Sequence, residues 1–211
     1  MGFADTLKTS TADAHRHAET RDLQRMLIRG ALDDERLAMY LLQLRMIHER
    51  LERLLDQNPA IAARIGWSDD SRHSRCLAAD VASLAGAAAG APCAATARLL
   101  DEIEAGVSRE PASLLGFVYV LEGSMNGNRF IVRSLRQTPA AQRCAFSYFD
   151  PYGDEQPRRW AAFKAALEAA GEHFDAPQRQ AGVEAALAMF GAISRISDEV
   201  FAPETPLAAK R

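Results

Sequence analysis

The chain of 211 residues has no apolar run long enough to cross a membrane. Its apolar stretches fall well short of the roughly 18–20 residues that a membrane-spanning helix needs. The first residues, MGFADTLKTSTADAH, also lack the cationic start and apolar stretch of a secretory signal. We therefore expect no membrane partner and a cytoplasmic location.

The chain also has few cysteines and no excess of basic residues. Cys76, Cys93 and Cys144 are odd in number, stand at unrelated spacings and form no CxxC pair, which predicts reduced structural thiols rather than a disulfide framework. The 25 lysines and arginines are outnumbered by 28 aspartates and glutamates, giving a net charge of −3. This balance argues against a nucleic-acid partner, because such affinity rests on neutralising phosphates.

Strand signals are nearly absent, and helical periodicity dominates the sequence. With 48% apolar and 25% charged residues, the composition is that of an ordinary globular domain. We predict an all-α fold: one compact helical bundle of about seven or eight helices over residues 1–211, ending in a flexible tail of about ten residues. The main predicted helices cover 5–29, 33–55, 74–84, 95–105, 111–137, 157–170 and 176–201.

One predicted helix carries glycines where helices avoid them. Gly123 and Gly127 stand one turn apart in its middle, and each costs about 1 kcal/mol relative to alanine. Two bare positions on one face let a large flat group approach the backbone, or let the helix bend. Tight packing against another helix explains the same pattern, so the glycines alone do not decide.

The first predicted helix carries a histidine and a carboxylate on one face. His15 and Glu19 are four residues apart, whereas His17 projects about 200° away from His15. A neutral imidazole binds a metal through one nitrogen while a carboxylate orients the other. A plain surface pair between His15 and Glu19 is the alternative interpretation.

Taken together, the two motifs resemble those of the heme oxygenase family, most closely its bacterial, biliverdin-producing branch. The string Leu7-Lys8-x-x-Thr11-x-x-x-His15-x-x-x-Glu19 is followed about a hundred residues later by Leu-Glu-Gly-Ser-Met-Asn-Gly, and the resemblance extends over nearly the whole chain. It implies the heme oxygenase-like helical fold. It also implies oxidative cleavage of heme at a meso carbon, with dioxygen and external electrons, to biliverdin, ferrous iron and carbon monoxide.

The resemblance also implies partners and roles for individual residues. Heme b would be both substrate and cofactor, and a separate redox protein (a reductase or a ferredoxin) would supply the electrons. His15 falls at the axial iron ligand and Glu19 at the carboxylate that hydrogen-bonds it. Distal contacts to heme fall on Gly123, Ser124 and Gly127. The expected walls of the heme pocket are Leu23, Leu27 and Phe190.

Two departures from the family pattern leave alternatives open. Ala162 and Ala166 stand roughly where the family has basic residues, so the candidates for binding the heme propionates are Lys8, Arg129, Arg133, Arg159 and Lys164. Ser124 replaces an aspartate that anchors the distal water network in animal-type members. Arg45 and His48 are the candidates to anchor it here.

Rival functions come from other classes. A non-catalytic heme carrier or sensor would keep the same fold and ligand. A di-iron oxidase would need several carboxylate and histidine ligands, and the only additional cluster is Asp69 and Asp70 with His73. A thiaminase-like enzyme would need a reactive cysteine beside a carboxylate, and the three cysteines stand in unremarkable contexts.

Overall fold

Helices account for the regular structure of residues 2–85 and 90–202, the part of the chain that the computed structural model describes; no strand occurs in it. The predicted all-α fold is confirmed. The predicted flexible tail falls on 203–211, outside the described residues. The α-helices are α1 (Phe3–Ser10), α2 (Ala12–Glu19), α3 (Asp22–Arg29), α4 (Asp34–Gln57), α5 (Pro59–Arg64), α6 (Ser74–Ala85), α7 (Ala94–Arg109), α8 (Ser113–Leu135), α9 (Gln156–Glu172) and α10 (Ala176–Phe201).

The prediction of one continuous helix over 5–29 is wrong, because two threonines interrupt it. Thr11 lies between α1 and α2, and its hydroxyl donates to the Leu7 carbonyl at 2.8 Å. Thr20 donates in the same way to the His17 carbonyl at 2.8 Å, and Arg21 then adopts an extended conformation. Threonine hydroxyls that bond nearby carbonyls compete with regular helix geometry. The resulting α2 is a short helix with its own direction.

The other predicted helices are confirmed within a few residues. α4 begins at Asp33, whose side chain accepts a hydrogen bond from the Arg36 amide at 2.8 Å. α10 begins at a capping box in which Asp175 and Gln178 satisfy each other's backbone amides. Residues 138–155, between α8 and α9, contain short 3-10 helices, among them η3 (Ser147–Phe149) and η4 (Gly153–Glu155). None of the described helices is both long and apolar enough to cross a membrane.

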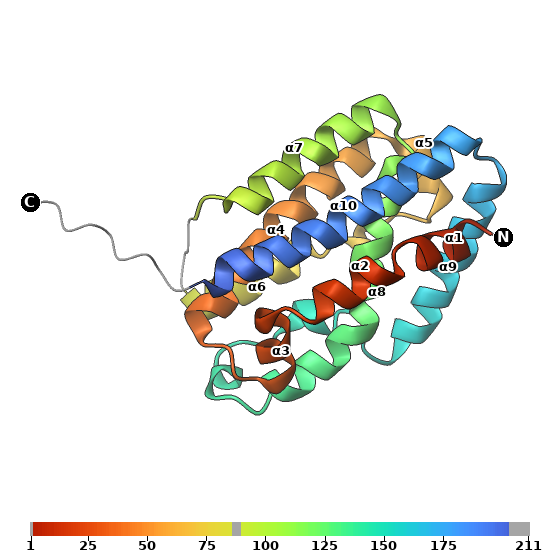
Figure 1. The fold of residues 1–211 in the computed structure, drawn as a ribbon. Coiled ribbons are helices and arrows are strands. Elements are labelled where there is room, and N and C mark those ends of the chain that lie inside the picture. The colour runs from red at the N-terminus through yellow and green to blue at the C-terminus, as the bar shows by residue number, and fades with distance from the viewer. Residues whose placement is uncertain (1, 86–89, 203–211) are drawn as a thin grey trace, which may run out of the picture.

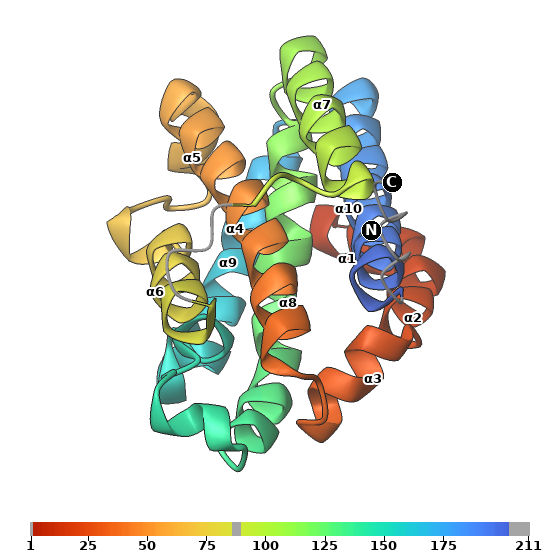
Figure 2. The same cartoon turned by 90° about the vertical axis from the view of Figure 1, so that its left-hand side faces the viewer.

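The bundle is organised around α10, which runs along α8, α7 and α4 (Figure 1). Seen from the side, α1 to α3 lie against α10 on one flank, while α5 and α6 lie on the other side of α4 and α8 (Figure 2). α3 reaches α8 where Gly30, with a φ of 62°, approaches the Ser134 backbone. The helix that carries His15 and the helix that carries the paired glycines are therefore both held by α10.

α8 and α10 cross at backbone contact. A side chain added at Gly116 would overlap the carbonyl oxygen of Gly182, and its Cβ would also lie 3.0 Å from Ala185. The Phe3 ring packs against Gly182 as well, where a Cβ would lie 2.6 Å from the ring. Glycine is required at this crossing because only a residue without a Cβ lets the two backbones touch.

We predict that Gly116→Ala destabilises the fold by about 1–3 kcal/mol, the usual cost of overpacking a core. Gly106→Ala is the matched control, because its Cβ would lie 3.6 Å from the nearest atom, an ordinary contact. That control should be neutral or gain up to about 1 kcal/mol from helix propensity. Urea denaturation measures both free energies of unfolding. A Gly116→Ala protein as stable as the control would contradict the backbone contact.

Candidate functional site

His15 and Glu19 form a pair on the outer side of α2. The His15 Nε2 and the Glu19 Oε1 are 3.2 Å apart, and the side chains are 56% and 63% exposed. The imidazole also leans on the Phe190 ring of α10, with ring centroids 5.2 Å apart. Glu19 thus holds one ring nitrogen, and the other remains available to a metal. Of the three expected wall residues, Phe190 is the one in contact with His15.

The other two expected wall residues face inward. Leu23 and Leu27 are fully buried in the hydrophobic core, so their role in this structure is packing. The neighbouring Ile28 is instead 50% exposed. On α3, the buried positions of Leu23 and Leu27 are therefore next to an exposed apolar position at Ile28.

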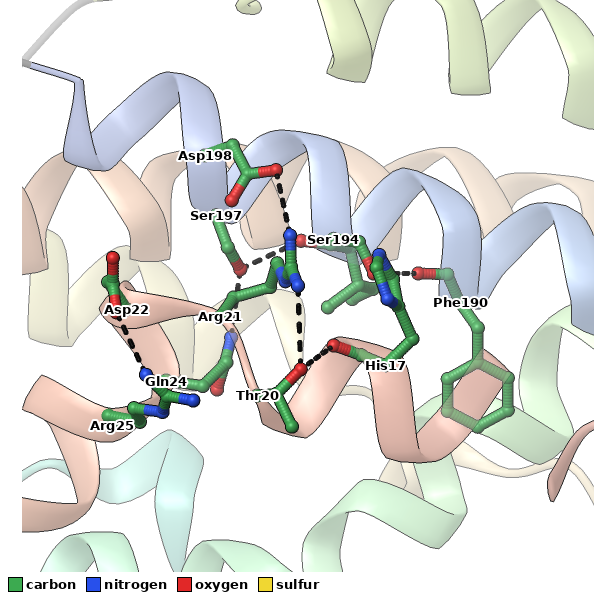
Figure 3. A network of polar contacts seen from close by, with 11 residues as sticks. His17, Thr20, Arg21, Asp22, Gln24, Arg25, Phe190, Ser194, Ser197 and Asp198 are labelled. Atoms are coloured by element: carbon green, nitrogen blue, oxygen red, sulfur yellow. Dashed lines mark hydrogen bonds and ion pairs between the residues drawn. The ribbon is translucent and has the colours of Figure 1, made fainter. Parts of the chain in front are cut away.

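The junction between α2 and α3 is pinned to the rest of the bundle by polar side chains (Figure 3). The Arg21 guanidinium lies 3.6 Å from the Asp198 carboxylate of α10. Gln24 donates to the Ser197 hydroxyl at 3.1 Å and to the Tyr40 hydroxyl at 2.9 Å. These contacts fix the direction of α2 and so the place from which His15 projects.

α8 presents bare backbone at the second glycine. A Cβ on Gly127 would meet nothing within 4 Å, whereas one on Gly123 would lie 3.5 Å from the Trp160 ring of α9. Phe130 follows one turn after Gly127 on nearly the same side and is 67% exposed. The accessible backbone is therefore bordered by aromatic side chains. Such a surface fits a flat macrocycle, because no side chain keeps it from the helix.

The candidate cations for propionates divide between two places. Gly2 and Asp5 of α1 lie against Glu168 of α9, which puts the helix of Lys8 beside the helix of Lys164. The Lys164 ammonium also lies 5.6 Å from the Trp160 ring centroid, next to Gly123. Lys164 thus lies near Gly123, and Lys8 stands on the helix that packs against the helix of Lys164.

The other three candidates point elsewhere. Arg159 is occupied by Asp70, at 3.5 Å, and lies over the Tyr152 ring at 4.4 Å from its centroid. Arg129 and Arg133 project roughly 200° and 240° around α8 from Gly127. They line a different cavity.

A buried polar cluster lies behind α8, and His48 belongs to it. The His48 Nε2 lies 3.2 Å from the Tyr148 hydroxyl, and the His48 and His73 ring centroids are 5.6 Å apart. Burial, together with the nearby His73, holds the pKa of His48 well below its ordinary value of 6.5. Burial likewise raises the pKa of Tyr148, and a hydrogen bond with Ser124 opposes that shift. Both rings are neutral at pH 7.

Arg45, the other candidate for the distal network, does not join this cluster. It donates to Glu49 at 2.7 Å, one turn further along α4. Its side chain is 36% exposed, and it makes no other polar contact among the described residues. The structure separates Arg45 from His48, although the two share a helix.

His73 and its partners were missed as site residues by the sequence analysis. The His73 Nε2 lies 3.0 Å from the Tyr152 hydroxyl and 3.4 Å from the carboxylate of Glu122, the residue before Gly123. Glu52 accepts the His73 backbone amide at 2.9 Å. A cavity of about 20 Å³ lies among these side chains, about the space of one water molecule. The sequence placed His73 only beside Asp69 and Asp70.

Tyr148 reaches the cluster because a buried carboxylate holds its loop. Asp80 of α6 accepts the backbone amides of Ser147 at 3.0 Å and Tyr148 at 2.9 Å. Phe146, just before them, has a φ of 53° and is fully buried. No local sequence signal announces this arrangement, because it joins two segments more than 60 residues apart.

Neither a di-iron site nor a reactive cysteine is formed in residues 2–85 and 90–202. No group of three or more His, Cys, Asp or Glu side chains there could hold a metal ion. Burial raises the pKa values of the Cys76, Cys93 and Cys144 thiols, which disfavours a reactive thiolate.

We predict that His48 makes the protein less stable in mild acid. The folded state keeps His48 neutral, whereas the unfolded chain takes up a proton below about pH 6.5. The unfolded state then binds more protons, so the free energy of unfolding falls as the pH drops, by at most about 1.4 kcal/mol per pH unit for one group. Urea denaturation between pH 7 and 5 should show a shallower decline for His48→Gln than for wild type. The exposed His173→Gln should keep the wild-type decline; equal slopes in all three proteins would contradict the prediction.

Comparisons with known proteins bear on the family and the fold of the chain. A family model described as "Heme oxygenase" matches residues 1–199. A heme oxygenase of Xanthomonas campestris pv. campestris is 42% identical over 57 residues, which cover 27% of this chain and 34% of that relative.

Solved structures share the fold at low sequence identity. A heme oxygenase of Leptospira interrogans has a TM-score of 0.82 at 19% identity, covering 94% of this chain and 100% of that one. Heme oxygenase-1 of Synechocystis, solved in complex with heme, has a TM-score of 0.82 at 16% identity and covers 95% and 93%. Heme oxygenase 2 of Chlamydomonas reinhardtii has a TM-score of 0.84 at 20% identity and covers 97% and 100%. Because the family model spans nearly the whole chain, this protein belongs to the heme oxygenase family.

Proposed function

We propose that the protein is a heme oxygenase that converts heme b to biliverdin, ferrous iron and carbon monoxide. Dioxygen and electrons from a separate reductase or ferredoxin are the other reactants, and the three free thiols suit a reducing cytoplasm. When bound, heme supplies the iron that takes up dioxygen and the carbon framework that is cleaved. The observation that carries the proposal is the His15–Glu19 pair on one helix together with the open backbone at Gly127 on another.

His15 is the proposed axial ligand to the heme iron. Glu19 holds one ring nitrogen and thereby orients the imidazole and raises the basicity of the nitrogen that binds iron. Phe190 supports the ring from the side of α10. Neutral histidine ligation, unlike thiolate, does not push electrons toward cleavage of the O–O bond.

The distal side is proposed to use bare backbone and weak acids. Gly123 and Gly127 let the macrocycle lie against α8, and Ser124 links this face to Tyr148. His48 stays neutral and Tyr148 stays protonated at pH 7, since burial disfavours the charged form of each. These groups can position ordered water without supplying a strong acid, which suits oxidation of the porphyrin carbon.

The propionates are proposed to lie toward Lys8 and Lys164. Lys164 lies beside Trp160, which borders Gly123 of α8, and the helix of Lys8 packs against the helix of Lys164. Neither ammonium group forms an ion pair with a carboxylate among the described residues, so both are available for charge-assisted hydrogen bonds.

Reconstitution with hemin tests the function directly. We expect a Soret band of bound heme that declines when ascorbate or a reductase is added in air, while a bilin band grows at longer wavelength. A Soret band that persists under these conditions would support a heme carrier or sensor and overturn the proposed activity.

We predict that His15→Ala lowers turnover by about a hundredfold or more, since loss of even an outer partner of a metal ligand costs 10–100-fold. His17→Ala is the matched control: it removes an exposed histidine from the same helix, about 200° around its axis. Heme spectra and bilin formation compare the two variants. Wild-type turnover in His15→Ala would refute the ligand assignment.

We predict that substitution of Gly127 weakens heme binding without weakening the fold. Because nothing lies within 4 Å of an added Cβ, the free energy of unfolding should not fall, and Ala should raise it by up to about 1 kcal/mol through helix propensity. Heme affinity should fall progressively from Ala to Val to Leu, by about tenfold or more for Val. Hemin titration and urea denaturation measure the two quantities. Unchanged affinity across the series would mean that the heme does not lie against Gly127.

A further inference from the structure

A second cavity, of about 430 Å³, lies on the side of α8 that faces away from the heme site. We propose that it binds a small polyanion, a molecule carrying two or more negative charges, and we name it the arginine pocket. Its walls are formed by the end of α8 and by the loop before α9. The lining residues are Arg129, Val132, Arg133, Arg136, Gln137, Asp150, Gly153 and Asp154.

Helix geometry separates the arginine pocket from the heme site. Arg129, Val132, Arg133 and Arg136 follow one another at spacings of three, one and three residues, so they form one stripe along α8. This stripe is centred roughly 180–200° around the helix from Gly127. A ligand in the pocket and a heme against the glycines therefore occupy opposite sides of one helix.

One arginine of the pocket is structural, and two are free to bind. The Arg136 guanidinium lies 3.3 Å from the Asp150 carboxylate, which ties the loop before α9 to α8. Arg129 and Arg133 are exposed, and neither makes a hydrogen bond or ion pair with any residue that the structure describes. Asp154 is the only other charged residue of the lining, so the pocket is net positive.

The lining also indicates the kind of ligand. Two guanidinium groups one turn apart suit a ligand with phosphate or carboxylate groups. Each guanidinium can donate two parallel hydrogen bonds to the oxygens of one such group. Gln137 adds an amide group as a further hydrogen-bonding partner. Val132 is the one large apolar side chain and no aromatic ring takes part, so the lining offers no surface on which a porphyrin, bilin or nucleobase could stack. A phosphate ester or diphosphate and a di- or tricarboxylate share the required chemistry.

Calorimetric titration of the full-length protein with pyrophosphate and with citrate tests the pocket. We expect saturable binding of at least one probe that weakens with added salt. Arg129→Ala and Arg133→Ala should each weaken it by about tenfold, since each removes charge-assisted hydrogen bonds to the anion. The control Arg109→Ala removes an exposed arginine of α7 and should bind like wild type. Tighter binding of pyrophosphate would indicate a phosphate ester or diphosphate as the ligand, and tighter binding of citrate would indicate a di- or tricarboxylate.

Hemin binding provides an independent readout. The double variant Arg129→Ala/Arg133→Ala should take up hemin with the wild-type Soret band, because both side chains lie across α8 from the heme site. Wild-type anion affinity in the double variant, or equal weakening in Arg109→Ala, would overturn the arginine pocket, as would failure of both probes to bind at low salt. None of these outcomes depends on whether the protein cleaves heme.

Discussion

The arrangement of the site depends on backbone contact between α8 and α10. Gly116 and Gly182 let these helices touch without side chains between them, and Phe3 closes the same crossing from α1. α10 also carries Phe190, against which the His15 ring rests. The crossing therefore sets the position of the glycine face relative to His15. The same property of glycine is used twice along α8: at Gly116 another backbone fills the space, and at Gly127 the space is left accessible.

Behind the glycine face, burial controls the protonation of the polar side chains. His48, His73, Tyr148 and Tyr152 contact one another in a region that almost excludes water, with Glu122 at its edge. Burial of His48 and Tyr148 favours their neutral forms, although each keeps a hydrogen-bonding partner. The neutral His48 and the protonated Tyr148 can form hydrogen bonds, and neither is a strong acid.

The candidate basic residues lie on two different sides of α8. Lys164 lies on the side of α8 where Trp160 meets Gly123, and the helix of Lys8 packs against the helix of Lys164. Arg129 and Arg133 point to the opposite side, where Arg136 and Asp150 join the loop before α9 to the helix. One helix thus separates the proposed heme site from the arginine pocket. The separation follows from the helical repeat, because residues two apart project in nearly opposite directions.

The sequence by itself determined the helices and the two motifs. Helical periodicity placed most helices within a few residues, and the i,i+4 spacing of His15 and Glu19 was enough to pair them. These are local relations, which act within one or two turns. Tertiary structure alone decided that His48 meets Tyr148, that Leu23 and Leu27 face the core, and that Lys164 lies beside Trp160. Such contacts join segments far apart in the chain, and their geometry is set by how whole helices pack.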